Sequence, residues 1–125
     1  MDALGSRGDD VLVIDDLSTG DRANLNSEAR FFELDIRSPE AGALVRREKP
    51  AAISHHAAQM SVSRSVTDPV FDADVNVMGS LNIALAAIDA GSRVVFSSTG
   101  GALYGAAQVT PTPEAAPAWP GSPHA

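Results

Sequence analysis

The sequence contains no cysteine, which excludes disulfide bonds, thiolate catalysis and cysteine-ligated metal. Basic residues are scarce: 9 lysines and arginines stand against 16 aspartates and glutamates, and the formal net charge is −7. A field of that sign repels nucleic acid and anionic lipid, so we expect neither as a partner. The N-terminus has no signal-peptide core, and no apolar run suggests a membrane span. We therefore expect a soluble, cytoplasmic protein.

The chain has 125 residues, of which 44% are hydrophobic, enough for one domain. Short apolar runs alternate with helical segments, and this alternation predicts an α/β fold with a parallel sheet. The expected strands are residues 11–14, 30–34, 51–55 and 93–96.

The expected helices carry recognisable start and stop signals. Residues 2–7 with Gly8 are typical of a last helical turn and its C-terminal glycine. Two further helices are expected to begin where a capping residue precedes Pro39 and Pro69. The second of these is expected to end at Gly91. It carries an apolar stripe, typical of a helix that packs on a core, formed by Val77, Leu81, Ala84 and Ile88. Residues 108–125 hold five of the eight prolines and are expected to form a loop.

Polar or small residues follow each expected strand. Ligands of open parallel sheets bind beyond the carboxyl ends of the strands, so these segments are the candidate site. The segments are Asp15 with Asp16, Asp35, residues 55–59 and residues 97–99.

Each candidate also has a plain structural interpretation. Asp15 is suited to accept hydrogen bonds from the ribose of a dinucleotide, but acids after strands also form turns. His55 and His56 point to opposite faces of a strand and are poorly placed to chelate one metal ion, so we expect no metal site. The hydroxyls of residues 97–99 lack the histidine base and GxSxG turn of a serine hydrolase, and fit either a sugar or a turn.

Five segments in this order resemble the extended short-chain dehydrogenase/reductase family, and within it the NAD-dependent sugar-nucleotide epimerases and dehydratases. They are residues 13–20 (VIDDLSTG), 32–37 (FELDIR), 55–59 (HHAAQ), 75–80 (VNVMGS) and 96–105 (FSSTGGALYG). Each segment alone is weakly specific, whereas five at matching spacing are strongly specific. The resemblance implies a partial Rossmann-like, doubly wound parallel sheet.

The resemblance also implies a role for each matching position. Asp15 would hold the adenosine ribose, and Thr99 would be the catalytic hydroxyl that also binds the substrate sugar. The remaining positions implied to bind NAD are Asp16, Leu17, Ser18, Thr19, Gly20, Asp35, Ile36, His56, Ala57, Ala58, Gln59, Met60, Asn76, Ser97 and Ser98. By the same resemblance the substrate is a nucleotide sugar, and full-length relatives form homodimers.

The chain departs from the family pattern in three places. It has no GxxGxxG loop, His124 stands where the family has its catalytic tyrosine, and no lysine follows it. We therefore expect residues 1–125 to be a fragment without the first strand and the C-terminal part, inactive alone and marginally stable. In the expected strand order the first strand would lie between residues 11–14 and 51–55, so its loss leaves two open inner edges. We also expect a frayed C-terminus at His124.

Two further interpretations remain alongside the enzyme. One is a non-catalytic remnant that binds nucleotide weakly or pairs with a partner chain that fills the sheet. The other is a response-regulator-like fold with Asp15 and Asp16 as an acidic metal site. That fold is disfavoured because no phosphorylatable aspartate ends a later strand.

Overall fold

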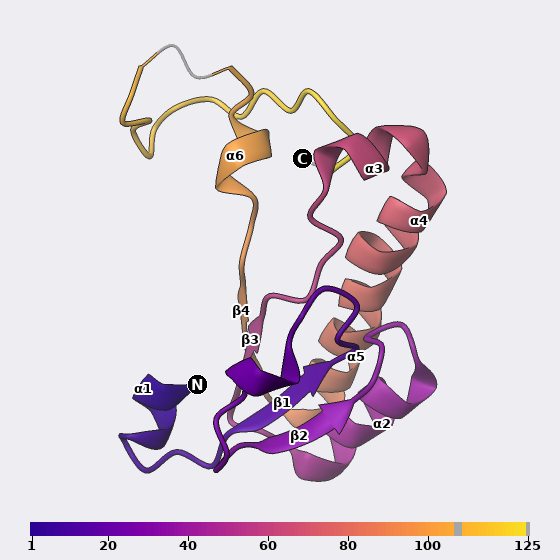
Figure 1. Ribbon diagram of the computed structural model, residues 1–125, viewed down its shortest axis with the longest axis vertical. Coiled ribbons are helices and arrows are strands. Elements are labelled where there is room, and N and C mark those ends of the chain that lie inside the picture. Colours follow the sequence, from indigo (N-terminus) through magenta and orange to yellow (C-terminus); the bar gives the residue numbers. More distant parts are fainter. Residues whose placement is uncertain (107–108, 125) are drawn as a thin grey trace.

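The computed structural model describes residues 1–106 and 109–124, and its four strands form two parallel pairs (Figure 1). Strand β1 (Leu12–Asp15) pairs with β2 (Arg30–Glu33), and β3 (Ala52–His55) pairs with β4 (Arg93–Phe96). All four lie within one residue of the runs predicted from the sequence. Of the expected Pro-rich loop, Gln108 and Ala125 lie outside the described residues.

The two pairs do not join into one sheet. No ladder connects β1 or β2 to β3 or β4 among the described residues. The α/β class and the parallel pairing are therefore confirmed, and so is the expected interruption between β1 and β3. Each pair instead packs against a shared layer of helices.

Two helical runs build that layer. Helix α2 (Pro39–Glu48) begins where the Ser38 hydroxyl accepts the backbone N–H of Ala41, as its cap predicted. The second run consists of α4 (Pro69–Ala73), a π-helical segment η2 (Asp74–Gly79) and α5 (Ser80–Ala90). It ends at Gly91, which adopts the left-handed conformation expected of a C-terminal glycine.

The two runs approach closely at two glycines. A Cβ on Gly42 would lie 2.8 Å from Asn82 Oδ1, and one on Gly79 would lie 2.6 Å from Ile36 Cδ1. Asn82 also donates to the carbonyl oxygens of Ile36 (2.7 Å) and Ser38 (2.8 Å). The buried core between the runs consists of Ile36, Ala41, Val45, Ile83 and Ala86.

The apolar stripe predicted on the long helix is not the face that packs. Val77 is 54% exposed, Leu81 48% and Ile88 74%. The buried positions of η2 and α5 are small or offset from the stripe, namely Gly79, Ile83, Ala86 and Ala87. The expectation was wrong because the close crossing of α2 selects small side chains rather than the most hydrophobic face.

The run Pro69–Ala90 contradicts the expectation that no segment has the length and composition of a membrane span. Its 22 residues are long and apolar enough to cross a membrane by length and composition, and 28% of its most apolar part is buried. Core helices of soluble proteins can have the same length and composition. Two of its aspartates, Asp72 and Asp74, are bound by other polar side chains of the chain.

Four short helices complete the described chain. They are α1 (Asp2–Gly5), the 3-10 turn η1 (Arg22–Asn24), α3 (Val62–Thr67) and α6 (Gly100–Leu103). Helix α1 lies where the sequence predicted a last helical turn, whereas η1, α3 and α6 were not predicted. In Figure 1 the C-terminal segment returns toward α3, far from the N-terminus.

Candidate functional site

The loop after β1 folds around the carboxylate of Asp15. Its Oδ1 accepts the backbone N–H of Leu17 at 2.7 Å, and Leu17 has a left-handed φ of 53°. A Cβ on Gly20 would lie 3.5 Å from Asp15 Oδ1, so the loop returns close to the carboxylate. Asp16 Oδ1 accepts the N–H of Ser18 in a similar turn. No described residue donates to Asp15 Oδ2, which leaves a half-buried acceptor at the end of β1.

At the end of β2, Asp35 is held by Arg37. The guanidinium Nε lies 2.9 Å from Asp35 Oδ2, while Nη1 bonds Asp74 Oδ2 at 2.7 Å. The hydrogen bonds from Arg37 lower the pKa of Asp35, against a smaller opposing effect of burial. Ile36 turns into the core. If these two residues contact a cofactor, the Ile36 contribution must come from its backbone.

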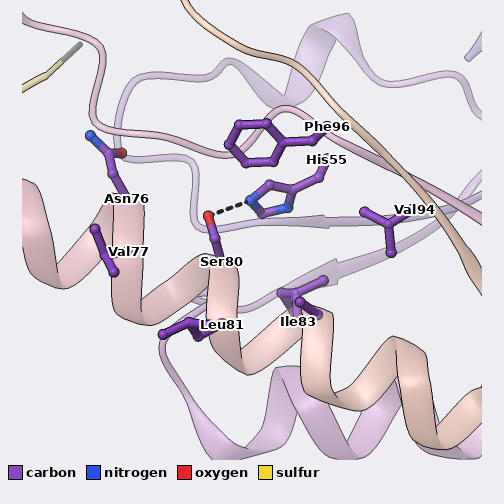
Figure 2. A pocket seen from close by; sticks show the side chains of 9 residues that line it. His55, Asn76, Val77, Ser80, Leu81, Ile83, Val94 and Phe96 are labelled. Atoms are coloured by element: carbon purple, nitrogen blue, oxygen red, sulfur yellow. Dashed lines mark hydrogen bonds between the residues drawn. The ribbon is translucent and has the colours of Figure 1, made fainter.

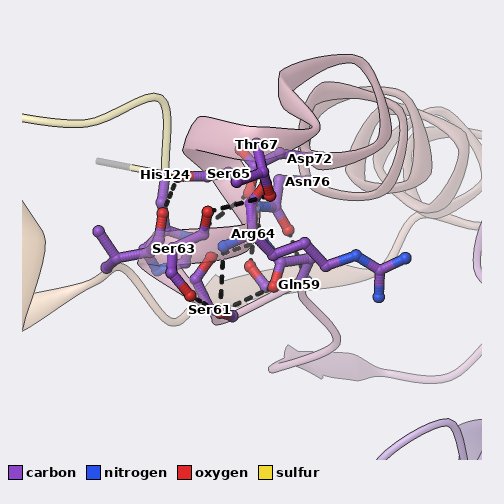
Figure 3. A network of polar contacts seen from close by, with 10 residues as sticks. Gln59, Ser61, Ser63, Arg64, Ser65, Thr67, Asp72, Asn76 and His124 are labelled. Atoms are coloured by element: carbon purple, nitrogen blue, oxygen red, sulfur yellow. Dashed lines mark hydrogen bonds and ion pairs between the residues drawn. The ribbon is translucent and has the colours of Figure 1, made fainter.

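Beyond β3, a polar network fixes the segment that contains Gln59 (Figure 3). The amide of Asn76 accepts the backbone N–H of Gln59 at 2.8 Å and donates to its carbonyl at 3.0 Å. The Gln59 side chain donates to Asp72 Oδ1 at 2.7 Å, and Asp72 is only 2% exposed. Asn76 thus holds the backbone of Gln59, and its predicted contact with a cofactor stays a prediction.

His55 and His56 leave β3 in opposite directions, as the alternation of strand side chains predicted. Buried His55 bonds the Ser80 hydroxyl at 3.0 Å and stacks on Phe96 with ring centroids 5.6 Å apart (Figure 2). Burial, and secondarily the nearby His56, lowers the pKa of His55. Exposed His56 bonds the hydroxyls of Ser54 (2.8 Å) and Ser97 (2.9 Å).

The hydroxyl segment follows β4. Ser97 is tied to β3 through His56, Ser98 is exposed, and half-buried Thr99 precedes α6. The structure therefore brings the ends of β3 and β4 together. It separately brings together the ends of β1 and β2, where the N–H of Leu34 bonds the carbonyl of Asp15.

A pocket of about 310 Å³ lies between the η2–α5 run and the helix-facing side of β3 and β4, and Asn76, His55 and Phe96 are among the residues that line it (Figure 2). Among the described residues, no group of three or more histidines, aspartates or glutamates is gathered for a metal.

Several participants in these networks were not singled out from the sequence. Arg37 and Asp72 bind candidate residues directly, and their only sequence signals are spacings of two residues from Asp35 and four from Asn76. His124 was expected to fray, but its side chain is 11% exposed and its Nδ1 lies 3.9 Å from Asp72 Oδ1. It packs there because the C-terminal segment returns to α3 and α4.

Comparison with known proteins gives consistent matches. The sequence profile of the NAD dependent epimerase/dehydratase family matches residues 1–125. A UDP-glucose 4-epimerase of Mycolicibacterium smegmatis is 44% identical over 100% of this chain and 42% of its own length.

Two solved structures are similarly close. A Thermotoga maritima UDP-glucose 4-epimerase with UDP-glucose superposes with a TM-score of 0.90 at 41% identity, covering 98% of this chain and 41% of the other. A Thermus thermophilus UDP-glucose 4-epimerase complexed with NAD gives 0.89 at 41% identity, covering 98% and 40%. The chain thus spans about two fifths of the length of these relatives.

Proposed function

This chain belongs to the NAD dependent epimerase/dehydratase family, and from that premise we propose that it forms the adenosine-binding half of the NAD site of a UDP-glucose 4-epimerase-like enzyme. Its relatives include one solved with NAD and one solved with UDP-glucose. The proposed substrate class is a nucleotide sugar.

The observation that carries the proposal is the environment of Asp15. One carboxylate oxygen is committed to the loop through Leu17, and the other carries no hydrogen bond from the described residues. An acceptor at the carboxyl end of a parallel strand suits the two hydroxyls of an adenosine ribose. The glycine at position 20 keeps the loop close to the carboxylate without a Cβ in the way.

The segment after β3 fits a cofactor better than any segment of the chain fits the pyrophosphate. Ala57 and Ala58 offer small side chains next to Gln59, whose backbone Asn76 holds, and this suits a flat ligand. The 125 residues contain no GxxGxxG loop and few basic side chains, so they offer no evident cradle for the pyrophosphate. The fit is therefore to the adenosine end.

Bound NAD would supply the reversible hydride transfer that the reaction of this family needs. The Thr99 hydroxyl is proposed to donate a hydrogen bond to the sugar oxygen that is oxidised. This bond would position the sugar hydroxyl for removal of its proton. No tyrosine in the 125 residues is followed four positions later by a lysine. We therefore expect the polypeptide tested alone to bind nucleotide weakly and not to epimerise UDP-glucose.

Titration with fragments of NAD tests the binding half of this proposal. We expect AMP to shift amide resonances of residues 15–20 with a dissociation constant on the order of 1 mM, about −4 kcal/mol. Nicotinamide mononucleotide, which lacks adenosine, is expected to leave them unchanged. NADP is expected to bind less well than NAD because its 2′-phosphate would approach the Asp15 carboxylate.

Two variants sharpen the test. Asp15→Asn keeps an oxygen for the Leu17 N–H but replaces the free acceptor by a donor, and is expected to weaken AMP binding at least about tenfold. Asp9→Ala removes the same charge near the other end of β1 and is expected to bind AMP as before. Equal binding of AMP by both variants, or production of UDP-galactose by the unmodified chain, contradicts the proposal.

The second candidate is a non-catalytic module that pairs with another chain. One observation favours it: β1 and β3 each lie in a two-stranded pair with one edge left open.

A further inference from the structure

The face of the β3–β4 pair that points away from α5 carries a histidine between two serines. His55 points toward α5 and bonds Ser80, so Ser54 and His56, its neighbours in the chain, lie on the opposite face. His56 Nε2 lies 2.8 Å from Ser54 Oγ, and His56 Nδ1 lies 2.9 Å from Ser97 Oγ. The fold thus supplies Ser97 with a neighbouring histidine that its own stretch of sequence lacks.

The two contacts of the His56 ring can have different roles. A neutral imidazole has one N–H donor and one acceptor nitrogen. If Nε2–H donates to Ser54 Oγ, then Nδ1 is the acceptor and faces the hydroxyl hydrogen of Ser97. An activated nucleophile has this arrangement, in which a base contacts the hydroxyl and a third group orients the base. All three residues are exposed, so a small molecule in solution can reach them.

A backbone donor lies next to the Ser97 hydroxyl in the chain. The N–H of Ser97 bonds the carbonyl of His55, whereas no described residue accepts the N–H of Ser98. In acyl-transfer sites the backbone N–H of the residue after the nucleophile commonly binds the oxygen that becomes negative. The Ser98 N–H therefore has the sequence position of such a donor, beside a hydroxyl that already contacts a base.

We propose that Ser97 is a nucleophile for acyl transfer from small esters, with His56 as its general base and Ser54 as the residue that positions the imidazole. The proposal requires the tautomer in which Nε2–H donates to Ser54 and Nδ1 accepts from Ser97. It depends neither on the proposed NAD site nor on the epimerase reaction.

The reaction conserves protons and electrons. Ser97 Oγ forms a bond to the ester carbonyl carbon while its proton passes to His56 Nδ1. The same proton leaves with the alcohol when the carbon–oxygen bond of the ester breaks. Water then attacks the acylated Ser97 and gives a proton to His56. That proton returns to Ser97 Oγ as the carboxylic acid is released.

The surroundings favour a small, uncharged ester. Val95 pairs with Ser54 in the parallel ladder, so its side chain lies on the same face, and it is 63% exposed. This apolar contact suits a short acyl group such as acetyl. The net charge of −7 disfavours an anionic substrate.

The uncharged ester p-nitrophenyl acetate tests the proposal on the unmodified chain. We expect release of p-nitrophenolate and acetylation of Ser97, which mass spectrometry of the acid-quenched protein locates. Ser63, an exposed serine whose hydroxyl bonds that of Ser61, is the internal control. We expect Ser63 to be acetylated at least about tenfold more slowly than Ser97, because its contact is another hydroxyl rather than a base.

Three variants separate the proposed roles. His56→Gln keeps hydrogen-bonding groups but no base, and is expected to slow acetylation of Ser97 at least about tenfold. Ser97→Ala is expected to slow p-nitrophenolate release, whereas Ser63→Ala is expected to release it as the unmodified chain does.

Ser54→Ala tests the positioning role. It is expected to slow acetylation of Ser97 and to convert the His56 ring from the Nε2–H tautomer to a mixture of both, which the ring nitrogen chemical shifts report. Slower acetylation with an unchanged tautomer would show that Ser54 does not act through the ring.

Two results overturn the proposal. Equal acetylation of Ser97 in the unmodified chain and in His56→Gln would show that the serine reacts without a base. Acetylation of a histidine ring with Ser97 unlabelled would show that imidazole is the nucleophile instead. Because Ser97 and Ser63 are compared within one unmodified molecule, the test holds even if a variant fails to fold.

Discussion

Gly79 leaves the space that the side chain of Ile36 occupies. The nearest approach, 2.6 Å from a would-be Cβ to Ile36 Cδ1, involves an atom that is itself buried in the core. A Cβ at position 79 and the Ile36 side chain could be separated only by moving the helix or the β2–α2 connection. The junction between the π segment and α5 therefore depends on the absence of a side chain at this position.

Gly79→Ala is expected to destabilise the chain by about 1–3 kcal/mol through overpacking, although alanine is the better helix former. Ile36→Ala is expected to cost about 2–5 kcal/mol by itself. Because the two changes relieve each other, the double variant should lose less than the sum. Urea unfolding of all four proteins measures this, with Gly5→Ala as control because nothing lies within 4 Å of that Cβ. Strict additivity would contradict the contact.

The buried His55 ring predicts a pH dependence of stability. Burial favours neutral His55, so its folded pKa lies below the ordinary 6.5. The unfolded chain then binds the proton more readily, and stability is full above about pH 6.5 and falls as pH drops toward the lowered pKa.

For one group the slope cannot exceed about 1.4 kcal/mol per pH unit. Urea unfolding between pH 7 and pH 5 measures it. His55→Gln is expected to flatten this dependence, whereas His56→Gln, at an exposed position, is expected to retain it. The opposite pattern would show that the buried ring is not the responsible group.

The sequence predicted which residues lie at the strand ends better than it predicted their hydrogen-bond partners. Asp15 ends β1, and the hydroxyl segment follows β4 as expected. Asp35 binds Arg37 two residues away, but the other partners are distant in sequence: Arg37 also binds Asp74, and Gln59 binds Asp72 and Asn76. Such contacts depend on how the helices cross, which no local pattern specifies.

At the scale of elements, strands and caps were predictable, and packing faces were not. Four strands and the starts of α2 and α4 follow from apolar runs and from a cap before proline. The 3-10 turn η1 and the short helices α3 and α6 carry no long periodic pattern, which is why they were missed. The stripe through Val77 and Ile88 was expected to be buried but is exposed. The helix packs instead through glycine and alanine, whose low hydrophobicity hides this face in the sequence pattern.

Asn82 joins the helical layer to the β2–α2 connection and gives a prediction for that element. Asn82→Asp replaces a donor to the carbonyls of Ile36 and Ser38 by an acceptor facing two acceptors. The expected loss is about 1–3 kcal/mol of unfolding free energy. Asn24→Asp, at an exposed position with the same change of charge, is the control. Equal urea midpoints for the two variants would exclude this function of the Asn82 amide.

At the scale of the whole molecule, the chain buries little apolar surface for its length. Among the described residues, seven hydrophobic side chains are buried, whereas many large ones are exposed, including all three of the apolar residues of β4. Both β pairs expose at least one edge, and the long helix exposes its apolar stripe. The stability of the isolated chain therefore rests mainly on the contact between α2 and α5.

We expect the purified chain to melt below about 45 °C, at the lower end for mesophilic domains. Its transition should be broad, because two β pairs without a common ladder can separate from the helices independently. Circular dichroism and calorimetry at several protein concentrations measure this. A sharp two-state transition of a monomer above that temperature would show that the helical layer alone is a sufficient core.

The separation of the strands into two pairs also bears on how the chain is made. The β1–β2 pair is complete in sequence once Glu33 has been synthesised, before any of the long helical run exists. The pairing of β3 with β4 must await the whole of that run. A nascent chain emerging from the ribosome could therefore form the first pair early, yet it has no stable support until α5 arrives. During that interval Ile14, which packs against the core cluster in the folded chain, stays exposed to water.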